Sequence, residues 1–220
     1  MMNVVPLTEA LRDRARPRAE AQDADEFMTA LVTGRGCRDD YVALVAQHYF
    51  IYRAIEQATE RMAADPVAAR FISPRLTRLP AIEADLDYLV GHDWREVIQP
   101  LASTAAYVER IEQVASVWVG GFIAHHYTRY LGDLSGGRLL RSLLQRQFGF
   151  DTNGVGLYLF AEIAEPRRFC STYREALDQA PWDDDERARV VAEVENAYRL
   201  TTDVFAELAR GRATAPLRLA

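Results

Sequence analysis

The sequence is poor in cysteine and in long apolar runs. Its 220 residues contain two cysteines, Cys37 and Cys170, which are far apart and outside any CxxC pair. This usage argues against a disulfide framework or a thiolate metal centre and favours a reducing, cytoplasmic location. No stretch approaches the roughly 18 uninterrupted apolar residues that a membrane span needs. The first residues also lack the apolar core of a secretory signal.

The chain also has no excess of basic over acidic residues. The formal net charge is −6, from 26 Lys and Arg against 32 Asp and Glu. Nucleic acid is therefore not expected as a main partner, because phosphate binding needs a basic surface. Hydrophobic residues make up 49% of the chain, which is enough for the substantial core of a globular protein.

Alternating strand patterns are absent, and helical periodicity dominates the chain. We predict one all-α domain over 7–209, with an N-terminal tail over 1–6 and a C-terminal tail over 210–220. A short helix is expected after Pro66. The longer helices are expected at about 7–16, 23–34, 39–63, 80–90, 103–116, 117–148, 166–180 and 183–209.

The stretch AHHYTRYLGDLSGGRLL, residues 124–140, places three glycines inside an apolar run that otherwise has a helical pattern. A glycine in a helix interior costs roughly 1 kcal/mol relative to alanine. Gly132 and Gly136 are four residues apart, so they share a helix face beside Asp133. Two interpretations are open at this point: close packing against another helix, or close approach of the backbone to a flat ligand.

The surrounding residues resemble the heme oxygenase family. The resemblance is carried by AHHYTRYLGDLSGG, by IYRAIEQA at 51–58, by TYREAL at 172–177 and by AYRLTTDVFAEL at 197–208. It implies a single all-helical domain that sandwiches heme between a proximal helix and a kinked distal helix. It also implies an enzyme that uses O2 to cleave heme to biliverdin, CO and iron. Its electrons would come from a separate reductase or ferredoxin, and the chain has no glycine-rich dinucleotide fingerprint of its own.

The resemblance assigns roles to residues on both sides of the expected heme. Gly132 and Gly136 would let the distal backbone lie against the porphyrin, and Asp133 would hold a water network that supplies protons for O2 activation. Tyr52 and Arg129 match residues that extend this network. Positions that match family contacts to the heme propionates and the pocket are Arg12, Tyr127, Arg174, Tyr198 and Phe205. A solvated helix face is the alternative explanation for each arginine, and core packing explains the two aromatic residues equally well.

One position departs from the family pattern. The family holds iron through a histidine nine residues before the methionine of an FM pair, and here that position is Ala19, counted back from Met28. An alanine methyl cannot bind iron, so no metal ligand is assigned and O2 activation should be weakened. Nearby Pro17 disfavours an interior helical position, and Cys170 replaces a lysine common in the family. A variant with its ligand removed, a substitute ligand and a natural paralogue with altered chemistry all fit this sequence.

The four histidines offer no obvious replacement. His48 is expected to be a buried or half-buried helix residue, and His92 an exposed turn residue. His125 and His126 are adjacent, so they point about 100° apart on a helix.

Two other functions remain as alternatives. A heme-binding or heme-handling protein without turnover would fit Ala19, Pro17 and Cys170 beside an intact distal motif. A di-iron oxygenase would need Glu-x-x-His pairs. No histidine of this chain follows an acidic residue by three positions, which disfavours that chemistry.

Overall fold

A computed structural model describes residues 6–14 and 22–214 of the chain. No strand occurs in these two ranges, which confirms the all-α prediction. The α-helices are α1 (Leu7–Arg14), α2 (Gln22–Val32), α3 (Arg38–Met62), α4 (Leu79–Leu89), α5 (Trp94–Val97), α6 (Ala102–Val117), α7 (Val119–Phe148), α8 (Pro166–Asp178) and α9 (Asp184–Thr214). Three short 3-10 helices are η2 (Ala68–Arg70), η3 (Pro74–Leu76) and η4 (Gly156–Tyr158).

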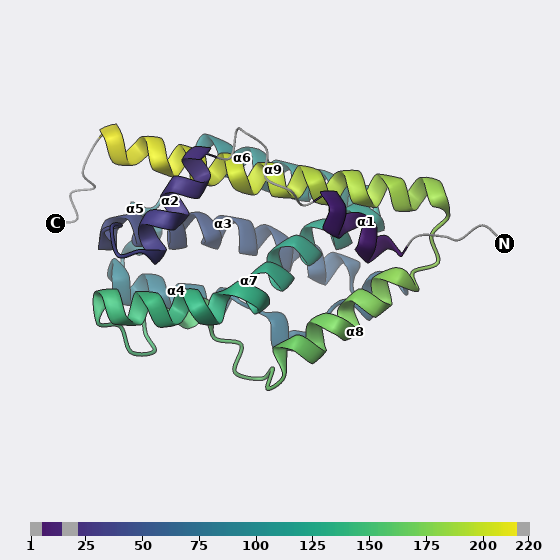
Figure 1. Cartoon of the computed structure of the whole chain (residues 1–220), viewed down its shortest axis with the longest axis horizontal. Helices are drawn as coiled ribbons and strands as arrows, with labels where there is room; N and C mark the ends of the chain where they lie inside the picture. The colour runs from purple at the N-terminus through teal and green to yellow at the C-terminus, as the bar shows by residue number, and fades with distance from the viewer. Residues whose placement is uncertain (1–5, 15–21, 215–220) are drawn as a thin grey trace.

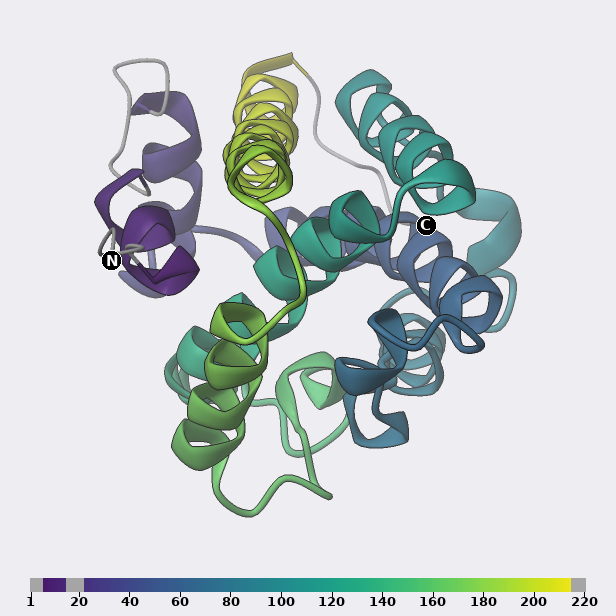
Figure 2. The same cartoon turned by 90° about the vertical axis from the view of Figure 1, so that its right-hand side faces the viewer.

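The longest helices cross one another around a common core. In Figure 1, α9 runs along the upper side of the molecule, with α2 and α7 packed against it. Figure 2 views the bundle nearly along α9, which lies between α2 and α6 and above α7. Helix α3 packs against α4 and α6. Residues of α2 and α9 line one cavity together with the glycines of α7.

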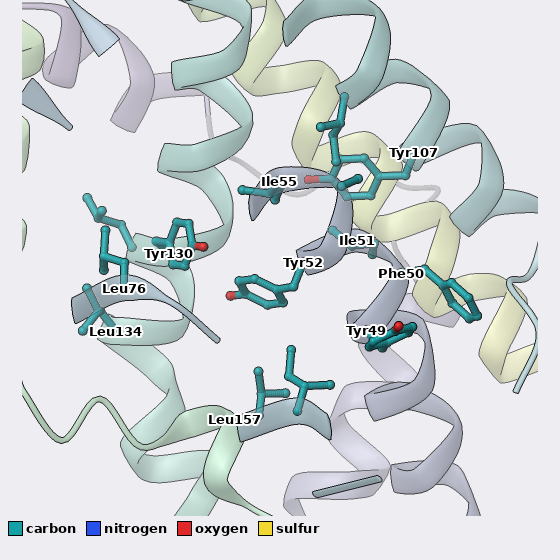
Figure 3. Close-up of a cluster of buried hydrophobic side chains, with 14 of the residues drawn as sticks. Tyr49, Phe50, Ile51, Tyr52, Ile55, Leu76, Tyr107, Tyr130, Leu134 and Leu157 are labelled. Atoms are coloured by element: carbon teal, nitrogen blue, oxygen red, sulfur yellow. The ribbon is translucent and has the colours of Figure 1, made fainter. Parts of the chain in front are cut away.

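The core is built from the apolar faces of these helices and is rich in buried tyrosine. Figure 3 shows Tyr52 extending from α3 toward Tyr130 on α7, and their ring centroids are 5.4 Å apart. The short helix α5, which the periodicity did not predict, exists because Trp94 is fully buried against Tyr49, with ring centroids 4.7 Å apart. Tertiary burial thus specifies an element too short to show a helical pattern.

Helix α7 carries the glycine motif. The hydrogen-bonded helix is continuous from Val119 to Phe148, and its ribbon changes direction along its length in Figures 1 and 2. Gly132, Gly136 and Gly137 fall in its middle, where missing side chains ease such a bend. The last helix, α9, continues to Thr214 and so passes the expected end near 209, because the single Gly211 does not stop it.

The segment after α7 is fixed by two buried charged side chains. Asp85 accepts backbone N–H hydrogen bonds from Gly154, Gly156 and Leu157 at 2.8–2.9 Å. The Arg78 guanidinium donates to the Leu159 carbonyl at 2.7 Å. These bonds hold η4 against the core, and with it Tyr158, whose ring lies beside α7.

Candidate functional site

An open, mainly apolar cavity of about 380 Å³ lies beside the glycines of α7. Its walls come from α2, α3, α7, α9 and the η4 segment. The lining residues are Met28, Val32, Leu44, His48, Arg129, Gly132, Asp133, Gly136, Gly137, Leu139, Leu140, Leu143, Tyr158 and Phe205. Few polar groups in a largely apolar lining are typical of a site for a flat organic ligand.

The three glycines in the middle of α7 differ in what surrounds them. A Cβ placed on Gly132 or Gly136 would meet no atom within 4 Å, so their bare backbone faces open space at the cavity. A Cβ on Gly137 would approach Tyr158 Cδ1 to 3.0 Å. Close packing therefore explains Gly137, against Tyr158 of the 3-10 helix η4. It is the wrong interpretation for Gly132 and Gly136, which keep the cavity wall free of side chains.

Asp133 belongs to a buried polar cluster at this wall. The Tyr52 hydroxyl donates a short hydrogen bond to Asp133 Oδ2, and Arg129 Nη2 lies 3.5 Å from the same oxygen. Burial opposes the charge on Arg129, but the carboxylate and nearby phenols outweigh burial and raise its pKa. Burial, reinforced by Asp133, also raises the pKa of Tyr52. The cluster is thus a carboxylate held between a permanent cation and a protonated phenol.

Arg129 also has donor capacity that the described part of the chain does not use. Its Nε is buried and has no hydrogen-bond partner among the described residues. Buried donors are nearly always paired with protein, water or ligand.

His48 lies at the same site. It is 4% exposed, and its ring stacks on Tyr52 with centroids 6.3 Å apart. Its Nδ1 donates to the Leu44 carbonyl at 2.8 Å. Burial, and secondarily the charge of Arg129, lower the pKa of His48 to about 4, so the ring is neutral at physiological pH. The expected burial is therefore observed, together with a position on the cavity wall that the helical pattern did not indicate.

Tyr127 and Arg174, matched to propionate contacts, lie near Tyr198, which was matched to a pocket position. Tyr198 is 41% exposed, and burial followed by the nearby Tyr127 raises its pKa, while the charge of Arg174 opposes the shift. Arg174 also lines a second cavity of about 840 Å³, which shares Leu139 with the first. Phe205 lines the first cavity and stacks on Phe27 at 6.4 Å.

Two residues to which the sequence analysis gave a place in the site lie outside the described part of the chain. Ala19 and the side chain of Arg12 are not among the described residues. Cys170, where a lysine is common in the resembled family, is 3% exposed, with its sulfur 4.0 Å from the Ser135 hydroxyl.

The remaining wall residues were not singled out from the sequence. Leu139, Leu140 and Leu143 could have been found, because they follow the glycines at helical spacing. Tyr158 carries no such signal, since it reaches the cavity only through the fold of the η4 segment. In the described ranges, no group of three or more His, Cys, Asp or Glu is placed to hold a metal ion. No helix there is long and apolar enough to cross a membrane.

Fold and site together define an all-α protein with a glycine-walled cavity beside a half-buried carboxylate. Comparison with known proteins gives the family: the Heme oxygenase family model matches residues 5–207. The chain belongs to the heme oxygenase family.

Individual relatives align with this chain over most of their own length. Heme oxygenase 1 of Synechocystis is 32% identical, over 93% of this chain and 85% of the relative. Human heme oxygenase 1 is 34% identical, over 92% and 71%. The crystal structure of the Synechocystis protein in complex with heme superposes with a TM-score of 0.85 at 31% identity, covering 95% of this chain and 96% of that one. The Leptospira interrogans heme oxygenase gives a TM-score of 0.83 at 29% identity, over 92% and 100%.

Proposed function

We propose that this chain binds heme in the glycine-walled cavity and cleaves it to biliverdin, CO and iron. The oxidant is O2, and the electrons come from a separate reductase or ferredoxin. The observation that carries the proposal is the open space at Gly132 and Gly136 directly beside Asp133. The two widely spaced free cysteines favour the reducing cytoplasm as the place of action.

The residues present fit heme by their chemistry. A flat porphyrin needs a wide apolar slot with no side chain on one wall, and Gly132 and Gly136 provide that wall. The two propionates need cations or hydroxyls at the edge, and Tyr127, Arg174 and Tyr198 offer them. Arg12 is a further candidate from the sequence. When bound, heme supplies the iron at which O2 is activated and is itself the molecule that is oxidised.

Asp133 is the group that we expect to organise water at the reacting face. Its carboxylate can only accept hydrogen bonds, so it orients the protons of a bound water. Tyr52 holds that carboxylate in one position by donating a hydrogen bond, and Arg129 holds it by its nearby charge. Such a fixed acceptor lets a water chain deliver protons without rearrangement of the protein.

We expect this chain to lack the iron ligand of its family at position 19. Ala19 has no lone pair to give to iron, and axial ligation is a principal means by which a protein tunes heme iron. We therefore expect heme binding with weak turnover. A second candidate function, heme binding or handling without turnover, is favoured by the same residue.

A hemin titration followed by turnover tests the proposal. Hemin is added to the purified chain, an electron donor is supplied, and the Soret band and biliverdin are followed. We expect one hemin per chain, slow Soret loss and biliverdin that disappears in Asp133→Asn. Hemin binding with no biliverdin at all would favour the heme-handling function, and failure to bind hemin would overturn both.

A further inference from the structure

His48 presents a nitrogen to the cavity that the function proposed above does not use. The residue comes from α3, lines the cavity, and is nearly sealed from bulk solvent. Arg129 and Asp133 are its charged neighbours, and Tyr52 stacks on its ring. It is therefore a member of the polar cluster rather than an isolated core histidine.

Hydrogen bonding fixes which nitrogen of His48 is available. The Leu44 carbonyl can only accept, so the 2.8 Å contact places the ring proton on Nδ1. Since the ring is neutral, Nε2 keeps its lone pair. No hydrogen-bond partner for Nε2 occurs among the described residues, yet Nε2 is not one of their sealed, unpartnered atoms. It therefore opens onto the cavity.

The other electron-pair donors on the described part of the wall are poorer ligands for iron. Asp133 is already held by Tyr52 and Arg129. Burial raises the pKa of the Tyr158 phenol, which keeps it protonated. Met28 offers a thioether, a soft donor suited to reduced iron. A neutral imidazole is the common protein ligand of heme iron.

We propose that His48 Nε2 is a nitrogen ligand that this chain offers to the iron of heme bound in the cavity. The inference rests on the proposed function, because it requires heme in this cavity. His48 shares its cluster with Asp133, so an imidazole from that side would compete with O2 for the iron. That competition adds to the effect of Ala19 in keeping unaided turnover weak.

Electron paramagnetic resonance of the ferric hemin complex tests this ligand directly. The full chain is prepared with ¹⁵N-labelled histidine and loaded with one hemin, and the nitrogen hyperfine coupling to iron is recorded. We expect a ¹⁵N coupling from one histidine on the high-spin signal that a single axial imidazole gives. This readout is independent of turnover and needs no variant to fold.

Three variants identify the histidine. His48→Leu replaces the imidazole with an apolar side chain of similar size, and we expect it to lose the ¹⁵N coupling. His92→Leu is the matched control, because the His92 side chain is 93% exposed and outside the cavity wall. It should give the parent spectrum. Added ¹⁵N-labelled imidazole should restore a nitrogen coupling in His48→Ala, because it refills the space.

Two results would overturn the inference. One is a parent complex without histidine coupling. The other is a His48→Leu complex that binds hemin and keeps the parent spectrum, which would place the ligand elsewhere in the chain. Both leave the proposed function standing, whereas failure of the parent chain to bind hemin would remove the function and this inference together.

Discussion

The Tyr52 hydroxyl donates a hydrogen bond to Asp133 Oδ2, joining α3 to the glycine-bearing face of α7 across 81 positions of sequence. The bond makes the orientation of the carboxylate a property of the core, because the Tyr52 ring is fully buried and packs on Tyr130. The proposed chemistry depends on this orientation as well as on the acid itself.

Tyr52→Phe tests that dependence. It removes the donor and keeps the ring, so the heme slot is unchanged while Asp133 can turn. We expect the rate of biliverdin formation to fall about tenfold, equivalent to about 1.4 kcal/mol of transition-state stabilisation, with hemin affinity nearly unchanged. Tyr88→Phe, at a tyrosine that is 51% exposed, is the control. A loss of hemin affinity with the parent rate would contradict the assignment.

Gly136→Ala should stabilise the hemin-free protein and weaken its binding of hemin. Its added Cβ meets nothing within 4 Å, so the hemin-free protein should gain up to about 1 kcal/mol of unfolding free energy through better helix propensity. The same methyl projects into the cavity, so hemin affinity should fall at least about tenfold, or about 1.4 kcal/mol. Urea unfolding and hemin titration measure the two effects.

Gly137→Ala is the matched control for that prediction. Its Cβ would lie 3.0 Å from Tyr158 Cδ1, so alanine should not stabilise the protein there. Equal stabilisation at both positions, or parent-like hemin affinity in Gly136→Ala, would argue against a ligand slot at the glycines.

Arg174→Gln should weaken hemin binding through the propionates. Removing one cation from a carboxylate contact costs about 1–3 kcal/mol, so the dissociation constant should rise at least about fivefold. The effect should vanish when hemin dimethyl ester replaces hemin, because the ester carries no carboxylates. Arg199→Gln removes a surface arginine that pairs with Asp203 and should leave affinity unchanged. An Arg174→Gln effect that persists with the ester would point to packing instead.

Acid should destabilise the hemin-free protein through its buried histidines. Burial lowers the pKa of His126 to about 3 and of His48 to about 4, below the unfolded value of about 6.5. The unfolded chain therefore binds more protons, and stability falls as pH drops below about 6.5. Each such histidine lowers the free energy of unfolding by up to about 1.4 kcal/mol for each unit that the pH falls. His126→Gln should flatten the pH dependence of urea unfolding between pH 6.5 and 4.5, whereas His92→Gln should not.

Much of this architecture follows from local patterns in the sequence. The helical ranges 39–63 and 80–90 lie within one residue of α3 and α4, because long amphipathic periods are read directly from the chain. Helix α5 was missed, since four residues carry no period and Trp94 is held by tertiary burial.

The site was only partly predictable for a similar reason. Residues inside the glycine motif could be identified from their neighbours in sequence. Tyr158 and the cavity-facing nitrogen of His48 depend on how separate elements meet, which no spacing encodes. The different surroundings of Gly136 and Gly137 also depend on the position of the η4 segment, because only Gly137 faces Tyr158.

We expect the Asp133 side of the site to support O2 chemistry, whereas Ala19 cannot bind iron. Single-turnover biliverdin formation is measured for the hemin-loaded parent, for the parent with added imidazole, and for Ala19→His. We predict slow turnover in the parent and at least tenfold faster turnover in Ala19→His, with imidazole giving a partial gain. Fast turnover by the unaided parent, unchanged by Ala19→His, would contradict this prediction.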